Sequence, residues 1–244
     1  MSGGVLFLAA NTPRSQAYAQ VMSARGIAVA RAILYDRPGA VQPGKADLPA
    51  RPNISTPVPL ADPLIPLTQS LAELTDDIRR VEAESVNDQA MLEAVRGAAA
   101  EGFEFVIYSG YGGQVISKAI LDAGLPFLHA HSGWLPQYRG STTIFYSLLA
   151  GMGCGVSVIN TAPEIDQGPI LARRQYPAPR KGVDIDYFYD PAIRADIMAE
   201  VVIEWQSRGR PEEIPPDGEP ANYYVVHPVL KHLALLGLEG DDAD

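Results

Sequence analysis

Short apolar runs alternate with helix-compatible stretches along most of this 244-residue chain, and this alternation constrains its fold more than any other feature. The apolar run at residues 5–10 is typical of a buried strand. A polar residue before Pro13 can cap a helix that Gly26 ends, and a second strand is expected at 27–34. A strand, a helix and another strand predict the start of a parallel α/β sheet.

The alternation continues toward the C-terminus. It predicts strands at 105–109, 127–131, 156–160 and 170–176. It predicts helices at 70–84, 87–100, 118–123, 141–150 and 191–206, with a terminal element at 223–236. The prediction is an α/β, Rossmann-like, mostly parallel twisted sheet with helices on both faces and a short C-terminal extension. Sites in such sheets lie at the carboxyl ends of the strands.

The expected organisation is an α/β domain at 1–180, a C-terminal helix and extension at 181–238, and an acidic tail at 239–244. Residues 35–66 interrupt the regular pattern with eight prolines. We expect a functional surface loop there, because structureless loops of this length are uncommon. The C-terminal elements could also form a homodimer contact.

Composition and charge narrow the class of protein. The net charge of −10 repels phosphate backbones, so we expect no nucleic-acid partner. No apolar run approaches the roughly 18 residues of a membrane span, and the N-terminus lacks the pattern of a signal peptide. The single cysteine, Cys154, cannot form an internal disulfide. These features predict a cytoplasmic protein with no membrane contact.

Two of the four histidines lie two residues apart on a predicted strand. His129 and His131 would face one pocket, since alternate residues of a strand point to the same side. Asp166 follows His131 by 35 positions, in an Asp-x-Gly turn. The histidines alone could be a structural, hydrogen-bonded pair. With Asp166 they could instead form a metal site of two histidines and one carboxylate.

Together these segments resemble the formyltransferases that use formyltetrahydrofolate. In that family a strand ends in Asn-x-His, a stretch containing Leu-Pro and a Gly follows, and a catalytic Asp comes later in an Asp-x-Gly loop. Residues 135–140, Leu-Pro-Gln-Tyr-Arg-Gly, match that stretch, and the Asp166 spacing matches as well. The resemblance is good over 105–176 and holds only in pattern in the N-terminal half.

The resemblance implies transfer of a formyl group from N10-formyltetrahydrofolate to an amine, with His129, His131 and Asp166 as catalytic residues. Asp166 would orient His131 and favour its protonated form, while one of the two histidines stays neutral. The family asparagine is His129 here. A histidine can also donate to the formyl oxygen, provided that its proton sits on the nitrogen facing that oxygen.

The resemblance also implies a folate site in the Gly-rich loop after the strand at 105–109, because glycine allows the backbone to approach a flat ring closely. An ordinary strand-to-helix turn is the alternative interpretation. The cofactor-binding residues so implied are Gly110, Tyr111, Gly112, Gly113, Gln114, Val115, Ile165 and Gly168.

The acceptor is expected to be a small-molecule amine, most simply an amino sugar or sugar nucleotide of a nonulosonate or polysaccharide pathway. We expect neither the extra C-terminal domain of the initiator-tRNA enzymes nor the N-terminal regulatory domain of the folate hydrolases. Residues 9–15 lack the phosphate-loop motif of the glycinamide ribonucleotide enzymes. His-x-His followed by Arg-Gly-Ser-Thr-Thr at 139–143 resembles a subgroup with sugar substrates.

The residues expected to bind the acceptor are Arg139, Gly140, Ser141, Thr142, Asp186 and Tyr187. The cations that could hold a phosphate or carboxylate of it are Arg14, Arg139, Arg173, Arg174 and Lys181. The segment 184–190, which contains Asp186 and Tyr187, could instead be the start of a helix, where acidic residues are favoured. Two other functions stay open: a metal-dependent hydrolase built on His129, His131 and Asp166, and a catalytically weak relative that binds folate or sugar.

Overall fold

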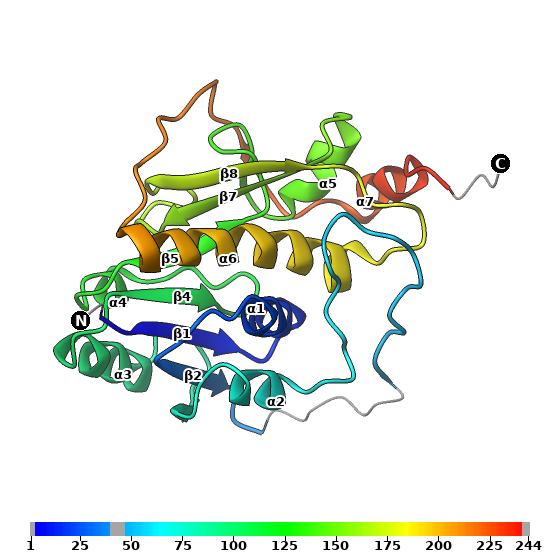
Figure 1. The fold of residues 1–244 in the computed structure, drawn as a ribbon. Coiled ribbons are helices and arrows are strands. Elements are labelled where there is room, and N and C mark those ends of the chain that lie inside the picture. The colour runs from blue at the N-terminus through cyan, green and yellow to red at the C-terminus, as the bar shows by residue number, and fades with distance from the viewer. Residues whose placement is uncertain (1–2, 40–46, 241–244) are drawn as a thin grey trace.

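A computed structural model describes residues 3–39 and 47–240 of the chain (Figure 1). Within these residues one sheet of seven strands runs in the order β3-β2-β1-β4-β5-β7-β8, and β6 pairs with β9 in a second, small sheet. The strands are β1 (Val5–Ala10), β2 (Arg31–Asp36), β3 (Ile78–Glu82), β4 (Phe105–Ser109), β5 (Phe127–His131), β6 (Arg139–Gly140), β7 (Cys154–Asn160), β8 (Ile170–Tyr176) and β9 (Asn222–Tyr223). β5/β7 and β7/β8 pair antiparallel, and the other neighbours in the large sheet pair parallel. The predicted mostly parallel sheet is confirmed.

Helices cover both faces of the large sheet, as predicted. They are α1 (Pro13–Ala24), α2 (Leu67–Ala72), α3 (Gln89–Ala100), α4 (Lys118–Leu121), α5 (Thr143–Leu149), α6 (Asp190–Arg208) and α7 (Pro228–Leu236), with one π-helical turn at Ile185–Tyr189. α1 and α6 pack together over one face (Figure 1), and α3 and α4 bury their apolar sides on the other. No helix in the described ranges is both long enough and apolar enough to cross a membrane.

β1 is an interior strand of the sheet, between β2 and β4, and its sequence explains why. All six of its residues are buried. Phe7 faces the α1 and α6 side, whereas Leu6 and Leu8 face α3 and α4. A strand buried on both faces has a continuous apolar run rather than an alternating one.

The turn after β1 begins α1 as the sequence predicts. The Oγ1 of Thr12 accepts a hydrogen bond from the backbone N–H of Ser15 at 3.2 Å, and Pro13 occupies the first turn. Gly26 follows the helix with a φ of 66°, a left-handed conformation that glycine adopts without steric cost. This cap fixes the position from which Arg14 projects.

The strand order reverses direction between β1 and β4. From β1 the chain builds β2 and then β3 on one side, and then returns to build β4 and β5 on the other. The connections therefore leave the carboxyl ends of β1 and β4 in opposite directions. Open α/β sheets bind ligands in the crevice that forms at such a point.

The predicted helix at 70–84 is wrong beyond residue 72. α2 ends at Ala72, and residues 78–82 form β3 at the edge of the sheet. Its sequence, Ile-Arg-Arg-Val-Glu, has few apolar residues because an edge strand exposes much of its surface, and charged side chains there discourage further pairing. The predicted strand at 27–34 is shifted, since β2 spans 31–36.

The long connection after β2 has no α-helix or strand over its described residues 47–66, in agreement with the prediction of an irregular loop there. Its end is tied to α1, because the side chain of Gln20 donates to the carbonyl of Asp62 at 2.9 Å and accepts from its N–H at 2.7 Å. Residues 40–46 of the predicted loop and 241–244 of the predicted acidic tail lie outside the described residues.

Candidate active site

His131 and Asp166 meet at the carboxyl edge of the sheet. His131 is the last residue of β5 and is buried. Asp166 lies in the loop between β7 and β8, and its Oδ1 is 3.4 Å from the Nδ1 of His131. The other ring nitrogen, Nε2, is 2.6 Å from the backbone carbonyl oxygen of Tyr138. The structure therefore brings together two residues that the sequence placed 35 positions apart.

Asp166 is held rigidly. Its φ of 53° is a left-handed conformation that few residues other than Gly, Asn and Asp adopt. Its second carboxylate oxygen accepts the backbone N–H of Gly140 at 2.7 Å. Gly140 has a φ of 105°, and a Cβ there would collide with the carbonyl of Tyr223 in β9. The small β6/β9 sheet therefore fixes the N–H that orients the carboxylate.

The charge state of His131 depends on opposing effects. Burial lowers the pKa of His131 below its ordinary value, while Asp166 and the Tyr138 carbonyl act in the opposite direction. The ring is therefore neutral near pH 7, although the sequence favoured its protonated form. A neutral ring has one proton for two acceptors, so protonation during a reaction would let it donate to both. This geometry suits a residue that takes up a proton and later releases it.

His129 is also neutral, and more firmly so. Burial, followed by the positive charges of Arg14 and Arg194 and then by His131, lowers the pKa of His129 well below its usual range. Its ring packs against Tyr108, with ring centroids 6.1 Å apart. Its Nδ1 is buried and has no hydrogen-bond partner among the described residues. An unpaired buried nitrogen is costly unless a ligand completes it.

Three polar residues beside the histidines escaped the sequence analysis as site residues. Asp190, at the start of α6, accepts from the Nε of Arg194 at 3.0 Å and from the hydroxyl of Ser132. Arg194 also donates to the carbonyl of Ala130 in β5, at 3.2 Å. The i, i+4 spacing of Asp190 and Arg194 was a readable signal of an ion pair on a helix. Nothing in the sequence indicated that this pair adjoins β5.

The expected folate loop follows β4 at the same edge of the sheet. The hydroxyl of Tyr35, from β2, donates to the side-chain carbonyl of Gln114 at 3.0 Å and accepts the N–H of Tyr111 at 3.3 Å. A Cβ added at Gly112 or Gly113 would meet nothing within 4 Å, so open space adjoins this backbone. The loop thus combines a braced base with an exposed glycine surface, which leaves room for a flat ring to approach.

The other two residues of the expected folate site lie in the Asp166 loop. Ile165 is 54% exposed, which is high for an isoleucine. Gly168 is buried, and a Cβ there would collide with the carbonyl of Asn160 at the end of β7. Gly168 therefore shapes the turn, and Ile165 is the residue with a free apolar surface.

The residues expected to bind the acceptor fall into two groups. Arg139, Gly140, Ser141 and Thr142 adjoin Asp166 through the Gly140 contact, and Thr142 supports this segment by accepting the N–H of Val226 at 2.7 Å. Asp186 instead forms an ion pair with Lys231 of α7. Tyr187 lines a cavity of about 460 Å³, together with residues 11–13 and Arg80, and neither His131 nor Asp166 lines that cavity.

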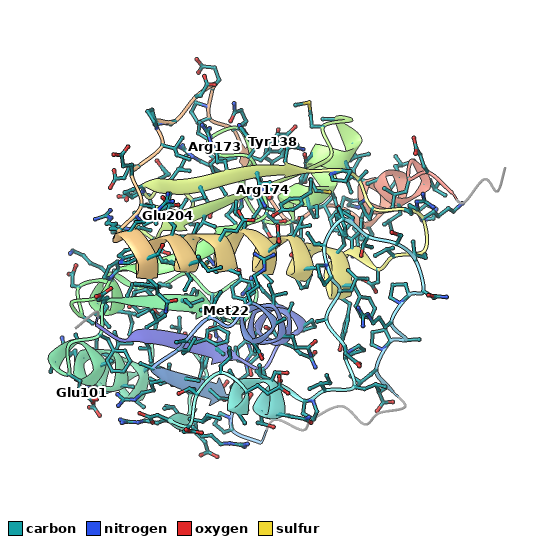
Figure 2. All side chains as sticks on the ribbon, in the orientation of Figure 1. Met22, Glu101, Tyr138, Arg173, Arg174 and Glu204 are labelled. Atoms are coloured by element: carbon teal, nitrogen blue, oxygen red, sulfur yellow. The ribbon has the colours of Figure 1, made fainter. Side chains whose placement is uncertain are left out.

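Several of the expected anion-binding cations are already occupied. Arg174 pairs with Glu200 and Asp196, and it lies beside α6 in Figure 2. Arg173 donates to the carbonyl of Leu135 at 2.9 Å and lies over the ring of Trp134. By contrast, the Nε of Arg139 is buried with no partner in the described part of the chain. Arg139 and Asp166 line one cavity of about 450 Å³.

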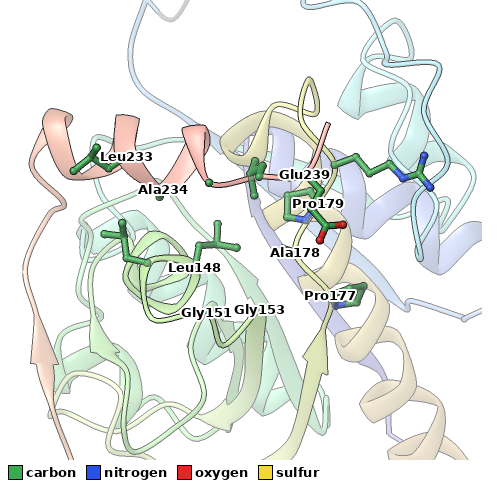
Figure 3. Close-up of a pocket in the computed structure, with 13 residues that line it drawn as sticks. Leu148, Gly151, Gly153, Pro177, Ala178, Pro179, Leu233, Ala234 and Glu239 are labelled. Atoms are coloured by element: carbon green, nitrogen blue, oxygen red, sulfur yellow. The ribbon is translucent and has the colours of Figure 1, made fainter. Parts of the chain in front are cut away.

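The metal-site alternative gains no support from the geometry. Across residues 3–39 and 47–240, no group of three or more His, Cys, Asp or Glu side chains is placed to hold a metal ion. A further cavity of about 510 Å³ lies between α5, α7 and residues 177–180 (Figure 3). It shares no lining residue with the His131 and Asp166 site.

The structure thus combines a histidine–carboxylate pair at the end of β5 with an open glycine loop after the neighbouring β4, both at the carboxyl edge of a mostly parallel sheet, where α/β enzymes carry their sites. The family model described as formyl transferase matches residues 8–183. The chain therefore belongs to the formyl transferase family, and the resemblance inferred from the sequence is confirmed.

Individual relatives support this assignment. The methionyl-tRNA formyltransferase of Chloroflexus aurantiacus is 28% identical over 159 residues, which are 63% of this chain and 49% of that protein. The enzyme of the same name from Thermus thermophilus is 37% identical over 91 residues, or 36% of this chain and 28% of that protein. The chain thus spans about half, or less, of the length of these relatives.

Solved structures share the fold. A sugar N-formyltransferase from a Shewanella species superimposes with a TM-score of 0.59 at 13% identity, covering 98% of this chain and 89% of that one. A methionyl-tRNA formyltransferase from Clostridium thermocellum gives 0.56 at 12% identity, covering 98% and 85%. At these identities the likeness concerns the fold alone.

Proposed function

We propose that this protein transfers a formyl group from N10-formyltetrahydrofolate to the amine of an amino sugar or sugar nucleotide. The observation that carries the proposal is the contact between His131 and Asp166 beside the unpartnered Nδ1 of His129. These side chains come from β5 and from the loop between β7 and β8, so local sequence does not impose their meeting. In a formyl transferase, such a pair is suited to acid–base catalysis.

The bound donor supplies the one-carbon unit: a bond forms between the acceptor nitrogen and the formyl carbon, the bond from that carbon to the folate nitrogen breaks, and one proton passes between the two nitrogens. Both ring nitrogens of His131 face protein acceptors, so a bound water would relay the proton between the acceptor amine, the neutral ring and the leaving nitrogen. Asp166 stabilises the ring while it carries the proton.

His129 has a separate role in this proposal. With its proton on Nδ1, the ring donates a hydrogen bond to the formyl oxygen as negative charge develops there. Because burial, Arg14 and Arg194 keep its pKa low, His129 stays neutral and acts as a hydrogen-bond donor rather than as a charged acid. The two histidines thus divide the work: one holds the oxygen, and the other moves the proton.

The residues of the loop after β4 fit a folate. The backbone at Gly112 and Gly113 faces open space and can lie against the flat ring, while Tyr111 and Gln114 are fixed by Tyr35. Gln114 also donates to the carbonyl of Glu84 at 2.9 Å, which holds the loop from a second side. Ile165, exposed on the neighbouring loop, adds an apolar surface for the donor.

An amino sugar is the proposed acceptor, and the strongest rival is methionyl-tRNA, which the names of the sequence relatives suggest. The sugar proposal is supported by the net charge of −10, which disfavours a long phosphate backbone. The rival would require a local basic surface strong enough to overcome that charge.

The test begins with calorimetry using 5-formyltetrahydrofolate, a stable stand-in for the donor. Binding is expected, and amino sugars, sugar nucleotides and charged initiator tRNA are then screened for formylation by mass spectrometry. Formylation of a sugar amine supports the proposal, and formylation of the tRNA alone would replace the acceptor. Absence of folate binding by folded protein would instead favour a protein that has lost the transferase activity.

A further inference from the structure

Arg14 places a positive charge at the point where the sheet reverses its strand order. It projects from the first turn of α1, at the end of β1, and reaches across to the end of β4. There its Nε donates to the hydroxyl of Ser109 at 3.2 Å, and its Nη2 donates to the carbonyl of Gly110. Both acceptors are neutral, so these contacts position the guanidinium without compensating its charge.

No carboxylate is free to balance this charge among the described residues. Asp190, the acid that acts on Arg14 electrostatically, is already bonded to Arg194 and Ser132. The other acidic groups that act on it are the phenols of Tyr18 and Tyr108, and burial raises the pKa of Tyr18 to about 12 and that of Tyr108 as well. Two guanidinium groups therefore share one carboxylate.

The surroundings of Arg14 oppose its charge. Burial, and then the neighbouring Arg194, lower the pKa of Arg14 from its ordinary value. A guanidinium nonetheless remains protonated in proteins. Arg14 therefore holds an uncompensated charge in a partly buried place, which is energetically unfavourable. An anionic ligand would remove that cost. In the described part of the chain, the Nη1 of Arg14 donates no hydrogen bond, so this amino group can donate to an anionic ligand.

The location relates this charge to the reacting centre. Arg14 is one of the charges that depress the pKa of His129, so it acts within electrostatic range of that ring. Gly110, which it contacts, begins the loop assigned to the folate. A group bound to Arg14 would therefore lie at the crevice between the β1 turn and the donor, from which an acceptor amine can approach the formyl carbon.

We propose that Arg14 binds an anionic group, a carboxylate or a phosphate, carried by the acceptor, so that the enzyme selects amines that bear a negative charge close to the amino group. This inference rests on the proposed function and narrows its substrate class. Arg14 is a specificity-determining residue in this view. Arg173 and Arg174 cannot take this role, because protein groups already occupy them.

The first experiment needs no acceptor. The thermal midpoint of unfolding is measured for native protein, Arg14→Gln and Arg96→Gln with inorganic phosphate or acetate, at constant ionic strength. Arg96 is an exposed arginine on α3, so its variant controls for the change in net charge. The anions should raise the midpoint of the native protein and of Arg96→Gln, and should do so clearly less in Arg14→Gln. Equal shifts in all three proteins would overturn the proposal.

Stability without anions separates binding from a structural role. Because the charge of Arg14 is uncompensated, Arg14→Gln should unfold at the same temperature as native protein or a higher one when no anion is added. A marked loss of stability, with no change in the response to anions, would make Arg14 a structural residue and would contradict the proposal.

The second experiment identifies the acceptor group. Three amino sugars are compared as acceptors: glucosamine, its 6-phosphate, and muramic acid, which carries a carboxylate. Native enzyme should use at least one charged amine with a higher kcat/KM than glucosamine, and Arg14→Gln should reduce that preference at least about tenfold, as expected for a charged hydrogen bond. Arg14→Lys keeps the charge but not the planar group with several N–H donors. Its preference for the charged amine should lie between those of the native enzyme and Arg14→Gln.

The outcomes distinguish this inference from the proposed function. If no amine is formylated and 5-formyltetrahydrofolate does not bind, the proposed function fails, while the phosphate and acetate shifts still decide whether Arg14 binds anions. If formylation occurs but Arg14→Gln lowers kcat/KM equally for all three amines, the residue acts at the reacting centre and the selectivity proposal is wrong. Preference for the phosphate or for the carboxylate identifies which anion the site takes.

Discussion

Asp166 shows how one backbone conformation can orient a side chain that we propose to be catalytic. Its left-handed φ of 53° turns the carboxylate toward the Nδ1 of His131 and toward the N–H of Gly140. Asparagine is among the few residues that also adopt this conformation readily. Asp166→Asn therefore removes the negative charge while keeping the loop, whereas alanine would also introduce backbone strain.

We predict that Asp166→Asn lowers kcat at least about 100-fold with little change in stability, because the ring of His131 loses the charge that stabilises its protonated form. Steady-state kinetics and thermal unfolding measure the two effects. Glu164→Gln, an exposed neutral substitution in the same loop, is the matched control and should be near native. A near-native rate for folded Asp166→Asn would remove Asp166 from the mechanism.

His129 gives a second prediction at the same scale. His129→Asn restores the residue of the related formyltransferases and should keep kcat within about tenfold of native, because an amide can also donate to the formyl oxygen. His129→Leu removes the donor and should lower kcat about 100-fold or more. Comparable, severe losses in both folded variants would show instead that the chemistry depends on the imidazole itself.

The sequence could bring forward His129, His131 and Asp166 as candidates, because the spacing of the histidines along a strand and the short Asp-x-Gly motif are local features. It could not find the role of Asp190 and Arg194, since only the packing of α6 against β5 brings them to the site. Nor could it separate Arg14 from the other expected cations. That distinction depends on which arginines have acidic neighbours in space, and sequence distance does not report this.

The loop after β4 is the element that most directly tests the folate site. A valine at Gly112 would enter open space in the free protein, and Gly112 does not have a positive φ, so the fold should tolerate it. Gly113 is less suitable, because its φ of 78° would strain any side chain whether or not a ligand is present.

We predict that Gly112→Val weakens binding of 5-formyltetrahydrofolate by at least about tenfold, since the added side chain would occupy the space that the ring requires. Calorimetry measures the affinity. Gly97→Val on α3 is the control, because its added Cβ also meets nothing and it lies away from the loop. Native affinity in folded Gly112→Val would place the folate elsewhere.

β3 shows where element prediction fails. Apolar strands such as β1 and β4 are buried on both faces, so their apolar composition identifies them in the sequence. β3 has Ile78 and Val81 as its only apolar residues, and both are only partly buried, so its charged sequence resembled a helix. β3 pairs with β2 through contacts that form only in the folded protein. One of them is the ion pair between Arg31 and Asp77, at 2.6 Å, just before β3 begins.

For the whole molecule, alternation of strands and helices was enough to predict the sheet and the edge at which the candidate site lies. The antiparallel pairing of β7 and β8 was not predictable in the same way, because apolar strands look alike whichever direction they run. That reversal also sets where the loop between β7 and β8 leaves the sheet: Asn160, the last residue of β7, pairs with Leu128 near the start of β5, and Asp166 reaches the Nδ1 of His131 from there.

The pair of neutral histidines should also be visible in the stability of the whole protein. The folded-state pKa values of His129 and His131 are lower than their ordinary value of about 6.5, so between the folded and unfolded pKa values the unfolded chain binds more protons. Stability from these groups is therefore fully present above the unfolded pKa and is lost as pH falls below it. Arg14 and Arg194 act with burial on His129, whereas Asp166 and Asp190 partly offset burial at His131.

We predict that the free energy of unfolding, measured with urea, falls between about pH 7 and about pH 5.5 with a limiting slope of about 1.4 kcal/mol per pH unit for each histidine that stays neutral. His129→Asn removes one titrating group and should make the fall shallower by up to that amount. His232→Asn, at an exposed position on α7, is the matched control substitution. Equal slopes in native protein and His129→Asn would mean that His129 titrates alike in both states, which would contradict the lowered pKa that keeps this ring neutral in the proposal.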